Sequence, residues 1–362
     1  MQRRAFLQTL AAVPMLEVSQ AAAQGGLKLG FDTYSLRAFK WKDMQLIDWA
    51  AAHQCDTIQI SSSDDYSSLD PAHLAKVKDY ATSKGMTLDA GIGCICPASK
   101  SWRAKDGKAE DVVVTGLKVA KAVGATSMRC FMGSSDDRTS WDQIERCMDV
   151  TIKVFRAVRT QAQDLNVKIA LENHAGDMQA RETRDVIEQS GKDFVAANLD
   201  TGNPMWVAED PVLTMEILGP YTVTTHVRDS AVFEHPRGAA AQWVVAGEGN
   251  VDLKRITELH HQLCPQAAMQ LEIITGRPPR IVPYLEPEFW KAFPKSLGSD
   301  LARFVDLAKK GHPFMGSMVI EDSPGKKPAE YTAALKEQQE VDLAKSLDYA
   351  RKSLGAGIKG TS

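Results

Sequence analysis

The sequence has few cysteines, no marked excess of charge and no long apolar run, and each absence excludes a class of protein. Six cysteines in 362 residues are too few for a disulfide-stabilised scaffold. A formal net charge of −3 supplies no basic field, so we do not expect nucleic acid as a partner. The apolar stretch at 9–18 is interrupted by Pro14 and Glu17, and no stable membrane span is predicted. No G-x-G-x-x-G or Walker motif follows a predicted strand, which leaves nucleotide binding without local support.

What the sequence does contain is a regular alternation of strand-like and helix-like segments. Hydrophobic residues make up 44% of the chain, enough for a substantial core. The predicted strands are 27–33, 57–61, 87–92, 127–132, 167–173, 194–200, 222–227 and 268–274. The predicted helices are 44–53, 71–84, 110–123, 140–165, 181–189, 211–218, 253–263 and 300–309. Eight strands alternating with eight helices predict an α/β protein, a single (β/α)8 TIM barrel, with a C-terminal helical extension.

The two ends of the chain differ from this pattern. Arg3 and Arg4, a mild apolar stretch and three alanines at 21–23 resemble a twin-arginine export signal. They predict a signal peptide over residues 1–23 and a periplasmic or otherwise exported protein. The barrel is expected over residues 24–320. Residues 321–362 are predicted to form a linker and a long amphipathic helix at 329–354, which packs on the barrel exterior or on a second subunit of a homo-oligomer.

Four potential metal ligands stand at the ends of four successive predicted strands. Glu172, Asp200 and His226 are separated by 28 and 26 residues, about one strand-plus-helix unit, and Glu272 follows after a longer gap. In a (β/α)8 barrel consecutive strand ends meet at one mouth. Three carboxylates and one imidazole suit a hard divalent cation, and burying these charges without one would be prohibitive. The sequence therefore predicts an enzyme with a divalent metal ion, Mn²⁺ first, with Mg²⁺, Co²⁺ and Zn²⁺ as alternatives.

Strand alternation places further side chains beside these ligands. His174 shares a face with Glu172, so it is expected to bind substrate, transfer protons or orient Glu172. Arg228 shares a face with His226 and offers a forked donor to substrate oxygens. Glu248 lies in a glycine-flanked turn, where it either reaches the site or stabilises the turn.

The motifs LENH, NLDTGN, THVRD and LEI resemble those of the xylose-isomerase-like TIM-barrel superfamily, the sugar phosphate isomerases/epimerases. The resemblance covers roughly residues 27–310. It implies that Glu172, Asp200, His226 and Glu272 bind one divalent ion. It also implies that Glu172 and Glu272 form the catalytic acid/base pair, exchanging protons with opposite faces of a ketose. The expected function is a metal-dependent isomerase or epimerase that acts on a small carbohydrate through an enediolate.

The sequence departs from the ketose 3-epimerases of that superfamily at two positions. Asn203, a candidate substrate contact, stands where those enzymes carry a histidine, and Met178 stands where they carry a second glutamate. A lyase or dehydratase acting on a keto-sugar such as a 3-keto-glycoside is therefore an alternative, and a non-catalytic sugar-binding protein is a second one. The superfamily's DNA-repair endonucleases use several zinc ions and many more histidines than the eight present here.

Two loops and one cysteine pair complete the candidates. The segment 278–293, with Trp290, and the loop holding Trp102 are predicted to close over the metal, with Trp290 stacking on a sugar ring. The alternative for the first segment is a contact between subunits. Cys94 and Cys96 are expected to be ordinary thiols, with a soft-metal or redox pair as the alternative.

Overall fold

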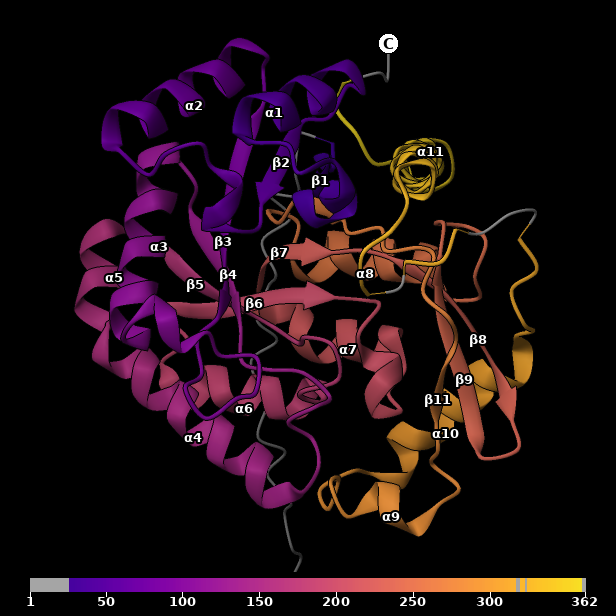
Figure 1. The fold of residues 1–362 in the computed structure, drawn as a ribbon. Helices are drawn as coiled ribbons and strands as arrows, with labels where there is room; N and C mark the ends of the chain where they lie inside the picture. Colours follow the sequence, from indigo (N-terminus) through magenta and orange to yellow (C-terminus); the bar gives the residue numbers. More distant parts are fainter. Residues whose placement is uncertain (1–25, 317–319, 323, 360–362) are drawn as a thin grey trace, which may run out of the picture.

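Eight parallel strands form the centre of the protein. A computed structural model describes residues 26–316, 320–322 and 324–359. The strands are β1 (Leu29–Asp32), β2 (Thr57–Ile60), β3 (Thr87–Cys94), β4 (Ser127–Phe131), β5 (Lys168–Glu172), β6 (Val195–Asp200), β7 (Thr222–His226) and β10 (Met269–Leu271). They pair in the order β10-β1-β2-β3-β4-β5-β6-β7. A parallel bridge between Val227 and Leu271 joins the two ends of this order, so the sheet closes into a barrel (Figure 1). The predicted TIM-barrel fold is confirmed.

Helices surround the barrel and follow the strands in chain order. They are α1 (Asp43–Ala52), α2 (Pro71–Ser83), α3 (Ala109–Val123), α4 (Trp141–Ala157), α5 (Arg159–Leu165), α6 (Ala180–Ser190), α7 (Pro211–Leu218) and α8 (Leu253–Leu263). Short 3-10 helices occupy Thr33–Phe39 (η1), Ser63–Asp65 (η2), Ala104–Asp106 (η3), Pro204–Val207 (η4) and Gly219–Tyr221 (η5). Asp70 and Asp210 cap α2 and α7: each precedes a first-turn proline and accepts a hydrogen bond from the backbone N–H of the residue after that proline. The single helix predicted at 140–165 is instead two, because the backbone leaves helical geometry at Val158.

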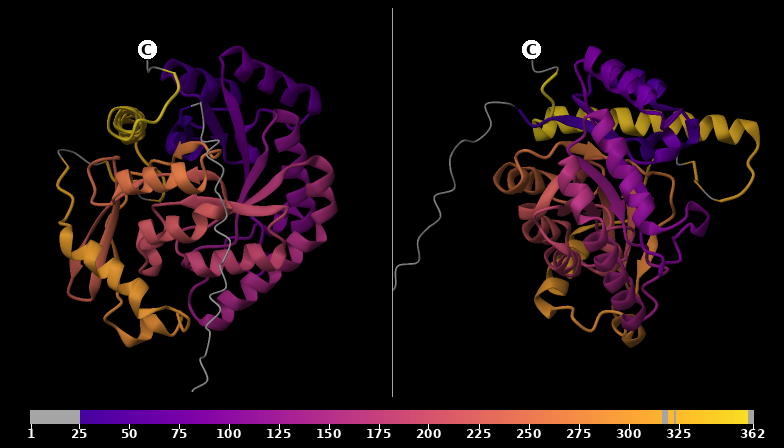
Figure 2. Two further views of the ribbon diagram at one scale, coloured as in Figure 1. Left: turned by 180° about the vertical axis from the view of Figure 1, so that it is seen from behind. Right: turned by 90° about the vertical axis from the view of Figure 1, so that its left-hand side faces the viewer.

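The helix that completes the ring is not the one predicted. We expected 300–309 to close the barrel and 329–354 to be an addition outside it. The structure instead places α11 (Ala329–Leu354) between α8 and α1, where Figure 1 shows it end-on and Figure 2 along its length. Its Leu343 and Leu347 are fully buried, and Glu340 accepts a hydrogen bond from Trp49 of α1 at 3.0 Å. The C-terminal helix therefore packs on this barrel, and the burial of its apolar side supplies the physical reason.

The connection between β7 and β10, together with the segment after β10, builds a second, smaller sheet where no strand is predicted from the sequence. Strands β8 (Asp229–His235) and β9 (Gly238–Val244) form an antiparallel hairpin, and β11 (Arg280–Val282) pairs with β9. The short helix α9 (Pro287–Trp290) follows, and α10 (Gly298–Lys310) packs against the hairpin rather than the barrel (Figure 1). This sheet forms one side of the region where the strands of the barrel end.

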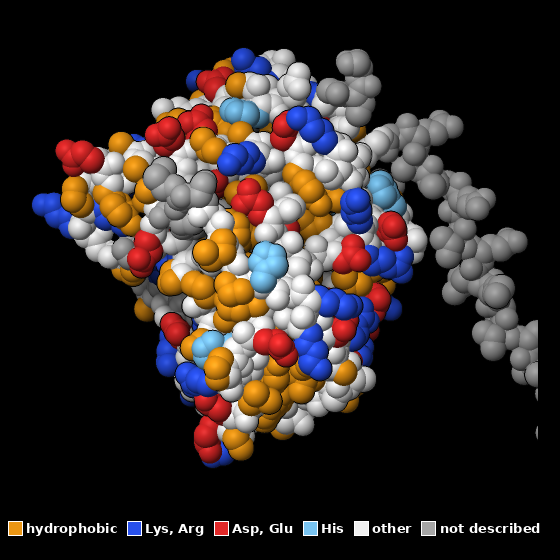
Figure 3. Space-filling model, turned by 90° about the vertical axis from the view of Figure 1, so that its right-hand side faces the viewer, with side chains coloured by type: hydrophobic (Ala, Val, Ile, Leu, Met, Phe, Trp, Pro, Cys, Tyr) orange, Lys and Arg blue, Asp and Glu red, His pale blue; other side chains and the backbone are white. Residues whose placement is uncertain are grey.

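The surface and the chain ends add two facts. On the face shown in Figure 3, basic and acidic side chains are interspersed, with no broad area of one sign. Among the helices of the described part of the chain, none is both long and apolar enough to cross a membrane. The predicted export signal at 1–23 falls outside the described residues and stays a prediction.

Candidate metal centre and active site

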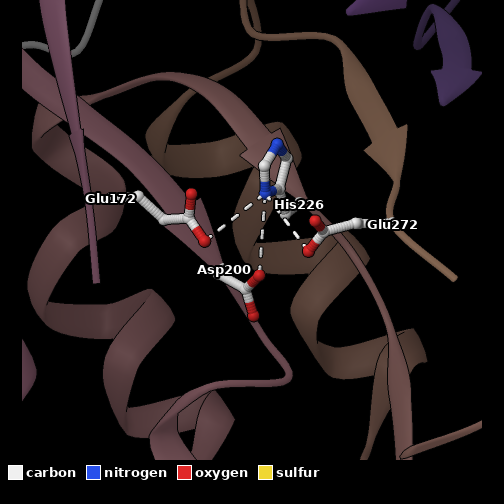
Figure 4. A group of neighbouring side chains, drawn as sticks. All are labelled: Glu172, Asp200, His226 and Glu272. Atoms are coloured by element: carbon white, nitrogen blue, oxygen red, sulfur yellow. Dashed lines mark ion pairs between the residues drawn. The ribbon is translucent and has the colours of Figure 1, made fainter. Parts of the chain in front are cut away.

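The four predicted ligands meet at the carboxyl ends of neighbouring strands. Glu172, Asp200 and His226 are the last residues of β5, β6 and β7, and Glu272 directly follows β10. One potential ligand atom from each residue lies within 4.8 Å of those of the other three, and all four residues are buried. Figure 4 shows the three carboxylates converging on the imidazole ring of His226. Residues separated by 28, 26 and 46 positions in the sequence are thus brought into one cluster by strand adjacency in the barrel.

Two buried arginines neutralise part of this charge. The guanidinium of Arg129, in the middle of β4, lies 2.5 Å from Oε2 of Glu172. Arg228 pairs with both Asp200 and Glu272 and lies against the ring of Trp243, 4.4 Å from its centroid. A β-carbon on Gly202 would lie 2.4 Å from Arg228, so glycine leaves the room this side chain needs.

The charges shift the pKa values of the cluster in opposite directions. Burial opposes ionisation of Glu172, but Arg129 and then His226 outweigh it and hold the pKa of Glu172 well below its ordinary value. Burial also disfavours the charged form of His226, yet Glu172 and Glu272 raise the pKa of His226 well above its ordinary value. For Glu272 burial prevails over Arg228 and His226 and raises the pKa to about 7. The carboxylates therefore stabilise positive charge on the imidazole that they surround.

A hydrogen-bond chain inside the barrel orients His226. Thr224 donates to Asp89 at 3.1 Å, so its oxygen accepts the amide N–H of Gln59 at 2.9 Å. The amide oxygen of Gln59 consequently faces Nε2 of His226 at 2.5 Å and accepts a hydrogen bond from its N–H. Nδ1 therefore faces the carboxylates, and in the neutral ring it directs a lone pair at them.

The donor set fits a divalent cation. Nδ1 of His226 is buried without a hydrogen-bond partner among the described residues. It lies 3.5 Å from oxygens of Glu172 and Glu272 and 3.7 Å from an oxygen of Asp200. A lone pair facing three carboxylates is repulsive unless a cation or a proton lies between them. Oxygen and imidazole ligands of this kind suit Mn²⁺, Mg²⁺, Co²⁺ or Zn²⁺.

A cavity of about 600 Å³ opens above the cluster and gives it access to a small molecule. Glu272, Arg228, His174 and Asn203 line it, as do the aromatic residues Tyr34, Phe131, Trp206 and Trp243. A lining that combines polar and aromatic side chains is typical of sites that bind small polar ligands.

Two of the cavity residues have defined hydrogen-bonding states. His174 stacks on Phe131 and donates its Nδ1–H to the carbonyl of Gly133 at 2.6 Å. Burial lowers its pKa, so the ring is neutral and Nε2 carries an accepting lone pair. Asn203 donates to Oε1 of Glu172 at 3.1 Å, and its own buried oxygen has no partner among the described residues.

The structure does not bring every candidate to this cavity. Trp290 packs beside Phe289 and Phe293 and donates to the carbonyl of Tyr284 at 2.7 Å, away from the cavity wall. Trp102 packs on the hydrophobic core, and Glu248 lines a different cavity beside α11.

Trp102 and Trp290, the two tryptophans expected to lie over the cluster, therefore do not line its cavity.

The cysteine pair also lies apart from the cluster's ligands: Cys94 and Cys96 are buried free thiols.

Several site residues were missed by sequence analysis. Arg129 and Gln59 are polar residues within otherwise apolar strands, and this was a usable signal at β4 and β2. Trp243 gave no such signal, because no strand is predicted from the sequence where β9 lies. Trp206 lies in a short 3-10 helix and reaches the cavity only through the fold.

Fold and site together define a (β/α)8 barrel with a buried cluster of potential metal ligands at its mouth. The chain belongs to the family described as xylose isomerase-like TIM barrel, whose model matches residues 47–282. No curated protein matches the sequence significantly.

Solved structures resemble the fold at low sequence identity. A D-psicose 3-epimerase in the presence of D-fructose is 16% identical, with a TM-score of 0.57, over 91% of this chain and 100% of that one. D-psicose 3-epimerase from Clostridium cellulolyticum H10 with D-tagatose is 18% identical, with a TM-score of 0.52, over 78% and 96%. The IOLI protein with a bound zinc atom is 14% identical, with a TM-score of 0.53, over 78% and 96%. These likenesses show the shared barrel.

Proposed function

We propose that this protein is a divalent-metal-dependent sugar isomerase or epimerase that acts through an enediolate. The observation that carries the proposal is the buried Glu172, Asp200, His226 and Glu272 cluster, whose ligand atoms lie within 4.8 Å of one another beneath an accessible cavity. Family membership and the likeness to structures of ketose 3-epimerases support it.

A divalent cation held by the four side chains, with Mn²⁺ as the first choice, would polarise the substrate carbonyl and stabilise the negative charge that develops on its oxygen. Glu172 and Glu272 stand on either side of His226, Glu172 at the end of β5 and Glu272 directly after β10. They would remove a proton from the hydroxyl-bearing carbon next to the carbonyl and return one. Arg129 and Asn203 hold Glu172 in position through hydrogen bonds.

The remaining polar residues of the cavity would bind sugar hydroxyls. The Nε2 lone pair of His174 accepts from a hydroxyl group, since Nδ1–H is engaged by Gly133. The unpartnered oxygen of Asn203 accepts from another. Arg228 lines the cavity beside Glu272 and contributes its guanidinium edge.

A second candidate reaction is β-elimination from a keto-sugar such as a 3-keto-glycoside. One observation favours it. Met178 is 2% exposed and packs in the core, so the position where ketose 3-epimerases carry a second glutamate presents no carboxylate to the cavity. Proton abstraction by the same glutamates would then be followed by loss of the β-oxygen substituent.

The test is exchange of solvent deuterium into keto-sugars, followed by mass spectrometry, in protein loaded with Mn²⁺. Glu172→Gln and Glu272→Gln should each abolish exchange, whereas Glu248→Gln, a change in a separate cavity, should not. An epimeric product identifies the first reaction and an enone product the second. Undiminished activity after removal of metal by a chelator would contradict the proposal.

We also propose that the protein is exported, on the strength of Arg3, Arg4 and the small residues at 21–23. Replacement of both arginines by lysine should retain the protein in the cytoplasm, as cell fractionation would show.

A further inference from the structure

A second cavity adjoins the one over the metal centre. It has a volume of about 400 Å³, and we call it the outer cavity. Ser62, Gly93 and Phe131 line both cavities, so the two meet along these residues. The loops after β2 and β3 and the first turns of α3 form the remaining walls (Figure 1).

The junction between the cavities is open. Gly93 is an exposed position of β3, and a β-carbon built on it would meet no atom within 4 Å. Its φ lies outside the left-handed region, so the backbone does not require glycine there. A larger residue would fit the local backbone and would enter the passage between the two cavities.

The outer cavity is lined by a mixture of polar and apolar groups. Arg103 bridges two of its loops, donating to Asp64 at 2.9 Å and to Asp106 at 2.6 Å. Ile92 and Phe131 supply apolar surface. A lining that combines charged, hydroxyl and apolar groups matches a sugar ring, whose hydroxyls need partners and whose C–H faces pack on apolar side chains.

We propose that the outer cavity is a second sugar subsite, so that the substrate is a two-ring saccharide whose keto ring lies over the metal centre. The assignment of the keto ring rests on the function proposed above. The second ring would occupy the outer cavity, with Arg103 and the carboxylates it holds facing its hydroxyls. Ser62 and Phe131 would flank the glycosidic linkage, because they line both cavities.

A substitution that fills only the outer cavity tests this assignment. Thr115 lies on the exposed side of α3, lines the outer cavity and does not line the inner one. Thr82 of α2 is a matched control, because it is also exposed, its hydroxyl also donates to the carbonyl four residues earlier, and it lines neither cavity. Thr115→Trp and Thr82→Trp therefore make the same change in the same local setting.

The probes are D-fructose with its glucosyl derivative isomaltulose, and 3-keto-glucose with 3-keto-trehalose. Calorimetry on the Mn²⁺-loaded protein should show at least tenfold tighter binding of a two-ring sugar than of its single-ring counterpart. Thr115→Trp should remove this preference while changing single-ring affinity less than twofold, and Thr82→Trp should retain it. Gly93→Leu, at the junction, should also weaken the binding of two-ring sugars, because its side chain would enter the passage that the linkage between the rings must cross.

Equal affinity of the wild-type protein for one ring and two, or no binding of any of these sugars, would overturn the subsite. So would an identical response of the two tryptophan variants. Deuterium exchange separates this question from the proposed function. A two-ring preference that Thr115→Trp removes, without exchange into any sugar, would support the subsite and contradict the enzymatic function.

Discussion

The amide oxygen of Gln59 lies 2.5 Å from Nε2 of His226, so a residue at the second strand decides which ring nitrogen faces the carboxylates. Thr224 fixes the orientation of that amide, and Asp89 fixes the hydroxyl of Thr224. Among the described residues, the side chains of Gln59, Thr224 and Asp89 make no hydrogen bond to the three carboxylates of the cluster. They nevertheless orient His226, the one nitrogen ligand, so that its Nδ1 faces the carboxylates.

Gln59→Met should lower the affinity for Mn²⁺ or Co²⁺ by about 10–100-fold, because the imidazole loses the partner that fixes its tautomer and ring orientation. Calorimetric titration of metal-free protein measures this. Gln270→Met is the control, since Gln270 is equally buried and donates to Thr57 and Asp89 but not to His226. Equal losses of affinity in both variants would show that the barrel interior, and not the contact with His226, controls binding.

Arg228→Met should lower the free energy of unfolding by about 3–5 kcal/mol in metal-free protein, because it leaves the charges of Asp200 and Glu272 buried without their partner. Saturating Mn²⁺ should reduce this loss, because the cation compensates the same carboxylates. Denaturation with and without metal measures both values. Arg138→Met removes a comparable buried pair with Glu182 outside the cluster, and its cost should not depend on metal.

Trp243→Ala should raise the KM for the sugar substrate at least tenfold, because this ring lines the cavity and packs on Arg228. Trp290→Ala should instead reduce thermal stability and leave KM unchanged, since Trp290 packs on other aromatic residues outside the cavity wall. Steady-state kinetics and thermal melts separate the two outcomes. Dissociation of a Trp290→Ala oligomer into monomers would identify a subunit contact.

The stability of the protein should fall in mild acid because of His260. This ring is 1% exposed, and neither of its nitrogens has a hydrogen-bond partner among the described residues. Burial lowers its pKa from 6.5 to about 4. Between these pH values the unfolded chain binds a proton that the folded protein excludes, so lowering the pH favours unfolding.

The expected contribution of His260 is a loss of roughly 3 kcal/mol between pH 6.5 and pH 4. Urea denaturation at a series of pH values measures it. His260→Leu should flatten this part of the profile, while His261→Leu, at the exposed neighbour on the same helix, leaves the buried ring in place and the profile intact. A steep profile in His260→Leu would assign the acid sensitivity to other groups.

The sequence alone determined the barrel and the four potential metal ligands at its mouth. Apolar strand segments at regular spacing, each ending in an acidic residue or histidine, admit few other arrangements, because buried carboxylates need a compensating cation. Local signals also placed most helix boundaries, as at Asp70 and Asp210, where a capping aspartate precedes a proline.

Only the tertiary structure decided which helix completes the ring and which side chains surround the cluster. Both α10 and α11 are amphipathic segments that follow β10, and the choice between them depends on which one buries its apolar side against the barrel. Likewise Trp243 reaches the cavity and Trp290 does not. Trp243 lies on the hairpin β8–β9, which borders the cavity, whereas Trp290, in α9, packs on neighbouring aromatic residues. Such choices depend on contacts between segments distant in the chain, and local sequence patterns do not encode them.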